Sequence, residues 1–188
     1  GGVLINQGIH AIDMMQWLAG MPVRVTGHIG TLAHQIEVED YATAIFEYSN
    51  GGHGTLHCTT ALAPNTQRLE VWGNRGVLIL NNWGLTVHRL DVELQEFIDT
   101  DRTEEFIPPG STKENFIVDP VADTHVVAIE DFVRAVLQDH KPLISGESAR
   151  DSQEIVAGIM LSSFLGKRIE LPVDRAAYDA LLAELRSQ

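Results

Sequence analysis

The chain has 188 residues, of which 44% are hydrophobic and 21% are charged, and these proportions are typical of a globular protein with a buried core. Thirteen basic and 26 acidic residues give a formal net charge of −13, which argues against nucleic acids and anionic membrane surfaces as partners. The single cysteine, Cys58, excludes an intramolecular disulfide and any cysteine-based metal site. Because Cys58 lies in an apolar run, we expect a buried, inert thiol.

The sequence contains no apolar stretch near the roughly 20 residues that a membrane-spanning helix needs. No basic segment precedes a short apolar run, so we expect no signal peptide and a cytoplasmic protein. The chain opens on Gly1-Gly2 without a methionine, which is typical of a segment of a longer protein.

The first predicted element is a helix over residues 8–19. Ile9 and Ile12 fall on one side of it at about 100° per residue. Gly20 and then Pro22 follow, and both are typical of a helix end.

The other side of this helix carries a polar stripe. Asn6, His10 and Asp13 are spaced i, i+4 and i+7, and Met14 and Trp17 share the stripe. A histidine with a polar neighbour one turn away suits general acid–base chemistry, and the bulky apolar pair beside it favours a covered cleft. A polar surface stripe, or a histidine hydrogen-bonded into the core, is the alternative interpretation.

Short strands rich in β-branched and aromatic residues fill residues 23–99. Turn signals about every ten residues indicate antiparallel neighbours, and Asn50-Gly51 favours a type I′ turn. The predicted strands are 23–32, 40–49, 53–62, 68–73, 76–82 and 85–91.

Several of these strands are apolar on both faces. Ile45 alternates with Ala44 and Phe46, and Leu78 alternates with Ile79. A sheet with one wet face would alternate apolar with polar residues, so we expect helices on one face and another partner on the other.

Residues 100–122 are predicted to be a loop, either an excursion over a cleft or a mobile connection. Helices and an edge strand then fill residues 125–187, and they are expected at 125–139, 148–166, 169–173 (the strand) and 174–187. Ser148 and Asp174 are the expected helix N-caps. The order helix, strands, helices predicts one α+β domain over residues 1–188, with an open, mostly antiparallel sheet and helices on one face.

Sequence motifs for most common chemistries are absent. The chain has no G-x-G-x-x-G, P-loop, G-x-S-x-G or H-E-x-x-H motif. His53 and His57 share a strand face without a third ligand nearby, so we predict no metal site.

Four stretches of the sequence, in order, resemble the C-terminal domain of the Gfo/Idh/MocA family of NAD(P)-dependent oxidoreductases. They are "GGVLINQGIHAIDMMQWLAG", "VEDYATAIFEYSNGGHGTLHCTTA", "RLEVWGNRGVLIL" and "AIEDFVRAVLQDHKPLISGESARDSQEIVAGIMLSSFLGKRIELPV". The resemblance implies a domain of the glyceraldehyde-3-phosphate-dehydrogenase C-terminal type, which supplies part of the substrate site and commonly oligomerises through its sheet face as a homodimer or homotetramer. It also implies that NAD or NADP is bound by an N-terminal Rossmann domain absent from this chain, so no cofactor-binding residue is expected here.

The resemblance also implies roles for the polar stripe. His10 matches the family's helix-borne catalytic histidine. Asp13 matches the aspartate that trails it and is a candidate substrate-binding residue. Asn6 stands where inositol-dehydrogenase-like members carry a carboxylate, and an amide can hydrogen-bond a hydroxyl but cannot relay a proton. The family's partner lysine is not in this chain, so the chain alone is expected to be inactive.

Two further residues are candidate substrate ligands. Arg68 suits a phosphate or carboxylate, or else is a solvated residue at a strand end, and His125 faces a cleft or the surface. The expected function is substrate binding and oligomerisation in an enzyme that transfers hydride between NAD(P) and a sugar, polyol or nucleotide sugar. The alternative is a free-standing dimerisation or ligand-binding module without redox activity.

Overall fold

The computed structural model describes residues 1–64, 67–81, 84–100, 107–117 and 124–187. Within them the chain divides into two compact units, one formed by residues 1–62 and 127–188 and the other by residues 63–126. Each unit contains one four-stranded antiparallel sheet. The α+β class and the antiparallel pairing are therefore confirmed, with the predicted strand region divided between two sheets.

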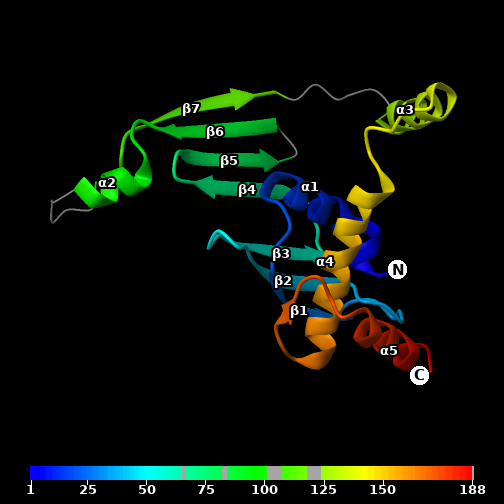
Figure 1. Ribbon diagram of the computed structural model, residues 1–188. Helices are drawn as coiled ribbons and strands as arrows, with labels where there is room; N and C mark the ends of the chain where they lie inside the picture. The colour runs from blue at the N-terminus through cyan, green and yellow to red at the C-terminus, as the bar shows by residue number, and fades with distance from the viewer. Residues whose placement is uncertain (65–66, 82–83, 101–106, 118–123, 188) are drawn as a thin grey trace. The chain divides into compact units, whose positions relative to one another are not determined.

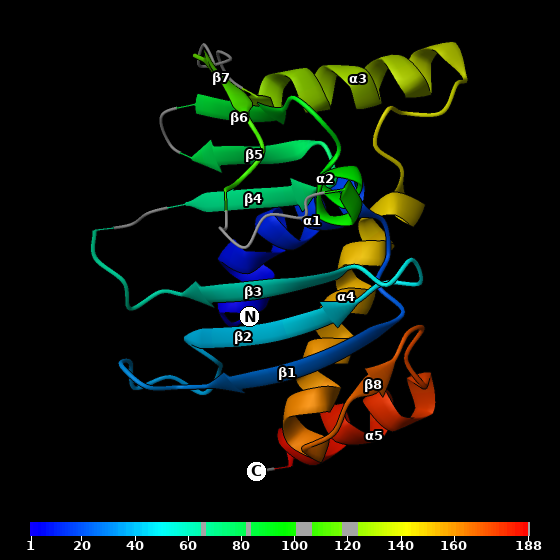
Figure 2. The same cartoon turned by 90° about the vertical axis from the view of Figure 1, so that its left-hand side faces the viewer.

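The first unit places its sheet against helices. A π-helical turn η1 (Leu4–Gly8) leads into α1 (Ile9–Ala19), and the sheet order is β3-β2-β1-β8. Figure 2 looks onto these strands with α4 behind them. The elements are β1 (Arg24–Gly30), β2 (Tyr41–Glu47), β3 (His53–Thr59), α4 (Gly146–Leu165), β8 (Ile169–Glu170) and α5 (Arg175–Arg186).

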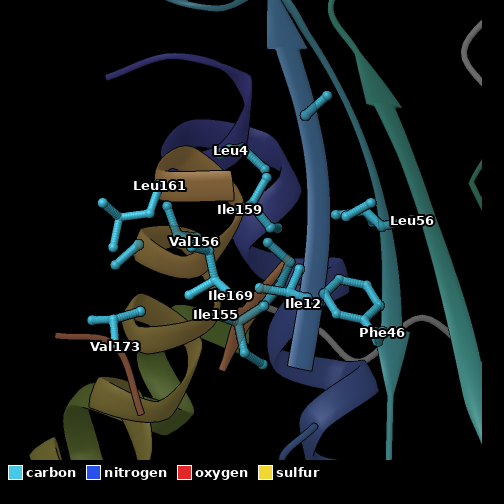
Figure 3. Close-up of a cluster of buried hydrophobic side chains, with 14 of the residues drawn as sticks. Leu4, Ile12, Phe46, Leu56, Ile155, Val156, Ile159, Leu161, Ile169 and Val173 are labelled. Atoms are coloured by element: carbon cyan, nitrogen blue, oxygen red, sulfur yellow. The ribbon is translucent and has the colours of Figure 1, made fainter. Parts of the chain in front are cut away.

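The core of the first unit lies between this sheet and the helices α1 and α4. Figure 3 shows Phe46 of β2 pointing toward Ile12 of α1 and Ile155 of α4, and all three side chains are 0% exposed. Strand β2 alternates buried and open residues along its length, and Ile45 is 50% exposed. Helices therefore cover one face of this sheet, as predicted, and the described elements of the first unit leave its other face open.

The outer edge of β1 is completed by side chains rather than by a strand. β8 pairs only with Arg24 and Val25. Beyond it, the Gly27 amide donates to Ser162 Oγ at 2.8 Å and the Ile29 amide donates to Ser163 Oγ at 3.0 Å. Two serines of α4 thus satisfy backbone donors that a longer neighbouring strand would otherwise pair.

The second unit holds the sheet β4-β5-β6-β7. Its elements are β4 (Arg68–Gly73), β5 (Gly76–Asn81), β6 (Gly84–Leu90), α2 (Leu94–Thr100) and β7 (Ser111–Phe116), as labelled in Figure 1. Along the chain, the division between the two units falls after Val126, within α3 (Thr124–Gln138).

The predicted boundaries were wrong in the second unit. Residues 94–100 are helical rather than strand, because Asn74 accepts the amides of Leu94 and Gln95 at 2.8 Å each and so holds the first turn of α2. Residues 111–116 form β7 inside the predicted loop 100–122. All six residues are exposed, so no alternation of apolar and polar residues marks the strand in the sequence. Its extended conformation depends on backbone hydrogen bonds to β6. Residues 101–106 and 118–122 of that predicted loop lie outside the described part.

Two predicted local signals also differ from the structure. The N-cap of α4 is Ser145, which accepts the Ser148 amide, so the helix begins at Gly146 rather than at residue 148. Gly51 has φ +85° whereas Asn50 has no positive φ, so their turn is not type I′. Gly166 and Asp174 act as predicted, ending α4 and capping α5.

The connection between β1 and β2 is organised by a buried carboxylate. Asp40 is 0% exposed and accepts the backbone amides of Leu32, Ala33 and His34 at 2.8, 2.8 and 2.9 Å, as well as the His34 ring at 3.1 Å. The Leu32 amide, followed by those of Ala33 and His34, holds the pKa of Asp40 well below its usual range.

A depressed carboxylate pKa makes this loop acid-sensitive. The ionised Asp40 side chain contributes its full stabilisation of the folded protein above about pH 4, where an unfolded aspartate titrates. This contribution is lost as the pH falls toward the lower pKa of Asp40 in the folded state. We expect Asp40→Asn to reduce hydrogen-exchange protection of the amides of residues 32–34, because an amide group replaces one of the two accepting oxygens, and to flatten the acid limb of the stability profile. Asp179→Asn, at an exposed position of α5, is the control and should leave both unchanged. Unchanged protection in Asp40→Asn would contradict this account.

Candidate functional site

The polar stripe predicted from the sequence lies on the outer side of α1. Asn6, His10, Asp13, Met14 and Trp17 are all exposed, and Trp17 is 77% exposed. On the opposite side of the helix Ile12 is fully buried. The first unit thus presents His10 and its neighbours outward on a helix that is anchored from behind.

The helix begins earlier than the predicted residue 8. Residues 4–8 form a π-helical turn, so Asn6 lies on a wider turn than α1 itself. The regular α-helical spacing expected for the stripe therefore holds from His10 to Asp13, and Asn6 is offset from it. Single π-turns within helices are frequent at functional sites.

Gly8 explains why the chain turns in this way at this place. A Cβ at Gly8 would lie 3.1 Å from the Val3 carbonyl oxygen and 3.1 Å from the Cys58 Sγ on β3. The absent side chain lets the junction of η1 and α1 pack directly on the sheet. Burial raises the pKa of the Cys58 thiol to about 11, so the thiolate is scarce at neutral pH, as expected for an inert cysteine.

The carboxylate of Asp13 is already engaged within the protein. Its Oδ1 accepts the Ser152 hydroxyl of α4 at 2.8 Å and the Gln16 side-chain amide at 3.3 Å. Ser152 is only 3% exposed. Ser152 was not predicted as a site residue, although its spacing with the buried residues Ile155, Val156 and Ile159 places a serine on an otherwise apolar helix face.

The remaining candidates lie in the second unit. Arg68, on β4, forms an ion pair with Glu70, which also accepts the Trp72 indole N–H. Glu70 has a lowered pKa because of these two donors, the Trp72 bond being the larger cause. His125 is exposed near the start of α3. The structure brings His10 and Asp13 together on one helix but describes Arg68 and His125 only within the other unit.

Two features are absent from the described residues. None of their helices is long and apolar enough to cross a membrane. The described part of the chain also contains no group of three or more His, Cys, Asp or Glu side chains that could hold a metal ion.

Residues 1–79, which include η1, α1 and the first four strands, match the family described as the Gfo/Idh/MocA C-terminal domain. These 79 residues are therefore similar to the Gfo/Idh/MocA C-terminal domain. The match contains the whole polar stripe and ends within β5.

Relatives extend the likeness along most of the chain. It is 24% identical over 156 residues to myo-inositol 2-dehydrogenase of Thermotoga maritima, covering 80% of this chain and 43% of that enzyme. It is 26% identical to the WlbA dehydrogenase of Bordetella pertussis, solved with NADH and UDP-GlcNAcA, with a TM-score of 0.59 over 93% of this chain and 46% of that one. The chain thus spans about half the length of these relatives.

A third likeness supports the fold alone. Levoglucosan dehydrogenase in complex with NADH superimposes with a TM-score of 0.70 at 17% identity, over 93% of this chain and 51% of that one. The chain therefore has the architecture of these dehydrogenases, as expected from the sequence.

Proposed function

We propose that this chain is a Gfo/Idh/MocA C-terminal domain and that it binds the substrate of an NAD(P)-dependent oxidoreductase. The enzyme would transfer hydride between the cofactor and a sugar, polyol or nucleotide-sugar carbinol or carbonyl. The observation that supports this most is the outward placement of His10 on α1, inside the segment that matches the family. Two relatives are named as acting on, or were solved with, molecules of these classes.

In this proposal His10 holds or removes the proton of the reacting hydroxyl, because an imidazole nitrogen can accept a proton and return it. Asn6 donates or accepts a hydrogen bond at a neighbouring hydroxyl but cannot relay a proton. The exposed Met14 and Trp17 would be covered by the neighbouring cofactor domain, which excludes water beside His10.

The cofactor would be held outside this chain. Dinucleotide folds use parallel strands with a glycine-rich turn, whereas every described strand pairing here is antiparallel and the sequence has no such turn. When bound, NAD or NADP would supply the hydride acceptor or donor. The residues of this chain supply only proton handling and substrate contacts.

The test of the proposal is turnover by the full-length protein. We expect NAD(P)-linked oxidation or reduction with at least one member of a sugar, inositol and nucleotide-sugar panel, followed at 340 nm, and none from the isolated 188-residue chain. Turnover by the isolated chain would contradict the proposal that the cofactor is held outside it. No turnover with any panel member would favour the alternative, a dimerisation or ligand-binding module without redox activity.

We further propose that the open face of the first sheet pairs with a second copy of the chain. The centre of this face carries no Asp, Glu, Lys or Arg, and two histidines there are bonded to neighbours: His28 Nε2 to the Tyr41 hydroxyl at 2.8 Å and His57 Nδ1 to Thr43 Oγ1 at 3.1 Å. The central part of the face is formed by the cross-strand partners on β1, β2 and β3, which are Thr26, His28, Tyr41, Thr43, Ile45, Thr55, His57 and Thr59.

Charges appear on this face only at one end, where they balance. Arg24 pairs with Glu47 and Glu170, and Arg168 pairs with Glu47. Two copies of a chain with a net charge of −13 repel each other, so a neutral face is where they approach most easily.

An oligomer in sedimentation at micromolar concentration is therefore expected. Ile45→Lys, at the middle of the open face, should shift the protein toward monomer because it would bury an unpaired charge twice in a two-fold interface. Leu165→Lys introduces the same charge at a half-exposed residue at the end of α4 and should leave the assembly intact. A wild-type protein that sediments as a monomer would refute the pairing.

A further inference from the structure

The joint between α1 and α4 contains one polar contact amid apolar packing. Ser152 of α4 is 3% exposed, and its hydroxyl donates to Asp13 Oδ1 of α1 at 2.8 Å. Around this contact Ile12 and Ile155 are fully buried. The Gln16 side-chain amide reaches the same Asp13 oxygen at 3.3 Å, from within α1.

A buried hydroxyl in such surroundings needs its acceptor, since an unsatisfied buried polar group is strongly unfavourable. Apolar contacts between two helices are non-directional and tolerate small rotations and slides. A hydrogen bond to a carboxylate is short and directional. The Ser152–Asp13 bond therefore selects one rotation of α1 about its axis relative to α4.

That rotation determines where His10 points. His10 precedes Asp13 by three residues in regular α-helix, and side chains three apart lie next to each other on a helix surface. We propose that Asp13 is a positioning residue, which acts through Ser152 to aim His10, rather than a ligand of the substrate. This inference rests on the proposed role of His10.

Steady-state kinetics of the full-length protein distinguish the two possible roles of Asp13, as a positioning residue or as a substrate ligand. If Asp13 acts through Ser152, Ser152→Ala and Asp13→Ala each lower kcat by about 10- to 100-fold with little change in KM, because a displaced catalytic group loses its reactive geometry. The double variant should be no worse than either single one, since both remove the same bond. Asp13→Asn should recover most of the rate, because an amide oxygen also accepts from a hydroxyl.

A substrate ligand would behave differently. In that case Ser152→Ala leaves turnover unchanged while the Asp13 variants raise KM, and this result would overturn the inference. Ser163→Ala is the matched control, with the same substitution on the same helix at a serine bonded to the Ile29 amide of β1 rather than to α1. It is expected to lower stability and leave kcat unchanged.

A second measurement needs no turnover. In the 188-residue chain, Ser152→Ala should shift the imidazole nitrogen resonances of His10 and leave those of His28, on the open face of β1, in place. Unmoved His10 resonances would refute the positioning role. If the His10 resonances move but the full-length protein turns over no panel substrate, the proposed function fails while the α1–α4 contact stands.

Discussion

Replacing His10 with alanine in the full-length protein is expected to lower kcat by about 10²- to 10⁴-fold, the range that a positioned acid–base group contributes. The loss should appear in kcat more than in KM, because proton transfer belongs to the transition state rather than to ground-state binding. The measurement is steady-state turnover with the best substrate of the panel. His53→Ala, at an exposed position of β3, is the control and should retain the wild-type rate.

Asn6 gives a smaller and different expected effect. Because an amide only hydrogen-bonds, Asn6→Ala should act mainly on KM, by no more than about tenfold, which is one lost hydrogen bond of roughly 1 kcal/mol. Unchanged rates in the His10 variant would remove His10 from the mechanism. An Asn6 variant as impaired in kcat as His10→Ala would show instead that the two residues act as one unit.

The second large effect concerns stability. Gly27 of β1 lies where the backbone of α4 comes closest, and a Cβ there would sit 2.7 Å from the Ile159 carbonyl oxygen and 3.0 Å from its Cα. Backbone atoms cannot rotate away, so either α4 or β1 must shift. We expect Gly27→Ala to reduce the free energy of unfolding by about 2–3 kcal/mol, the usual effect of overpacking a tight core.

Urea unfolding measures this loss as a lower midpoint with an unchanged slope. Gly54→Ala, two strands away on β3, is the matched control, because a Cβ there meets no atom closer than 3.7 Å. It should change stability by no more than about 0.5 kcal/mol. Equal midpoints for the two variants would contradict the close approach of α4 at Gly27.

Elements with a strong apolar period or a cap were predictable from the sequence. The helix signals at Gly20, Gly166 and Asp174 coincide with helix ends in the structure. These signals are local: a cap satisfies backbone groups within a few residues, so the sequence alone contains the information.

Features that depend on partners far away in sequence were not predictable. β7 has no apolar alternation and exists through its pairing with β6, and Asp40 is recognisable only once three amides converge on it. The same holds for the candidate site. The sequence placed His10 and Asp13 on one helix, but the contact of Asp13 with Ser152 joins residues 139 positions apart.

The two serines that meet the edge of β1 have a consequence for self-assembly. A bare strand edge is a template onto which another chain can add, and this is how misassembled sheets and fibrils grow. At Gly27 and Ile29 the amides that such a strand would capture already donate to Ser162 and Ser163. Helix α4 therefore blocks the addition of another strand at this edge and also contributes to the core. Replacing both serines with alanine would favour aggregation before it altered the shape of the folded domain.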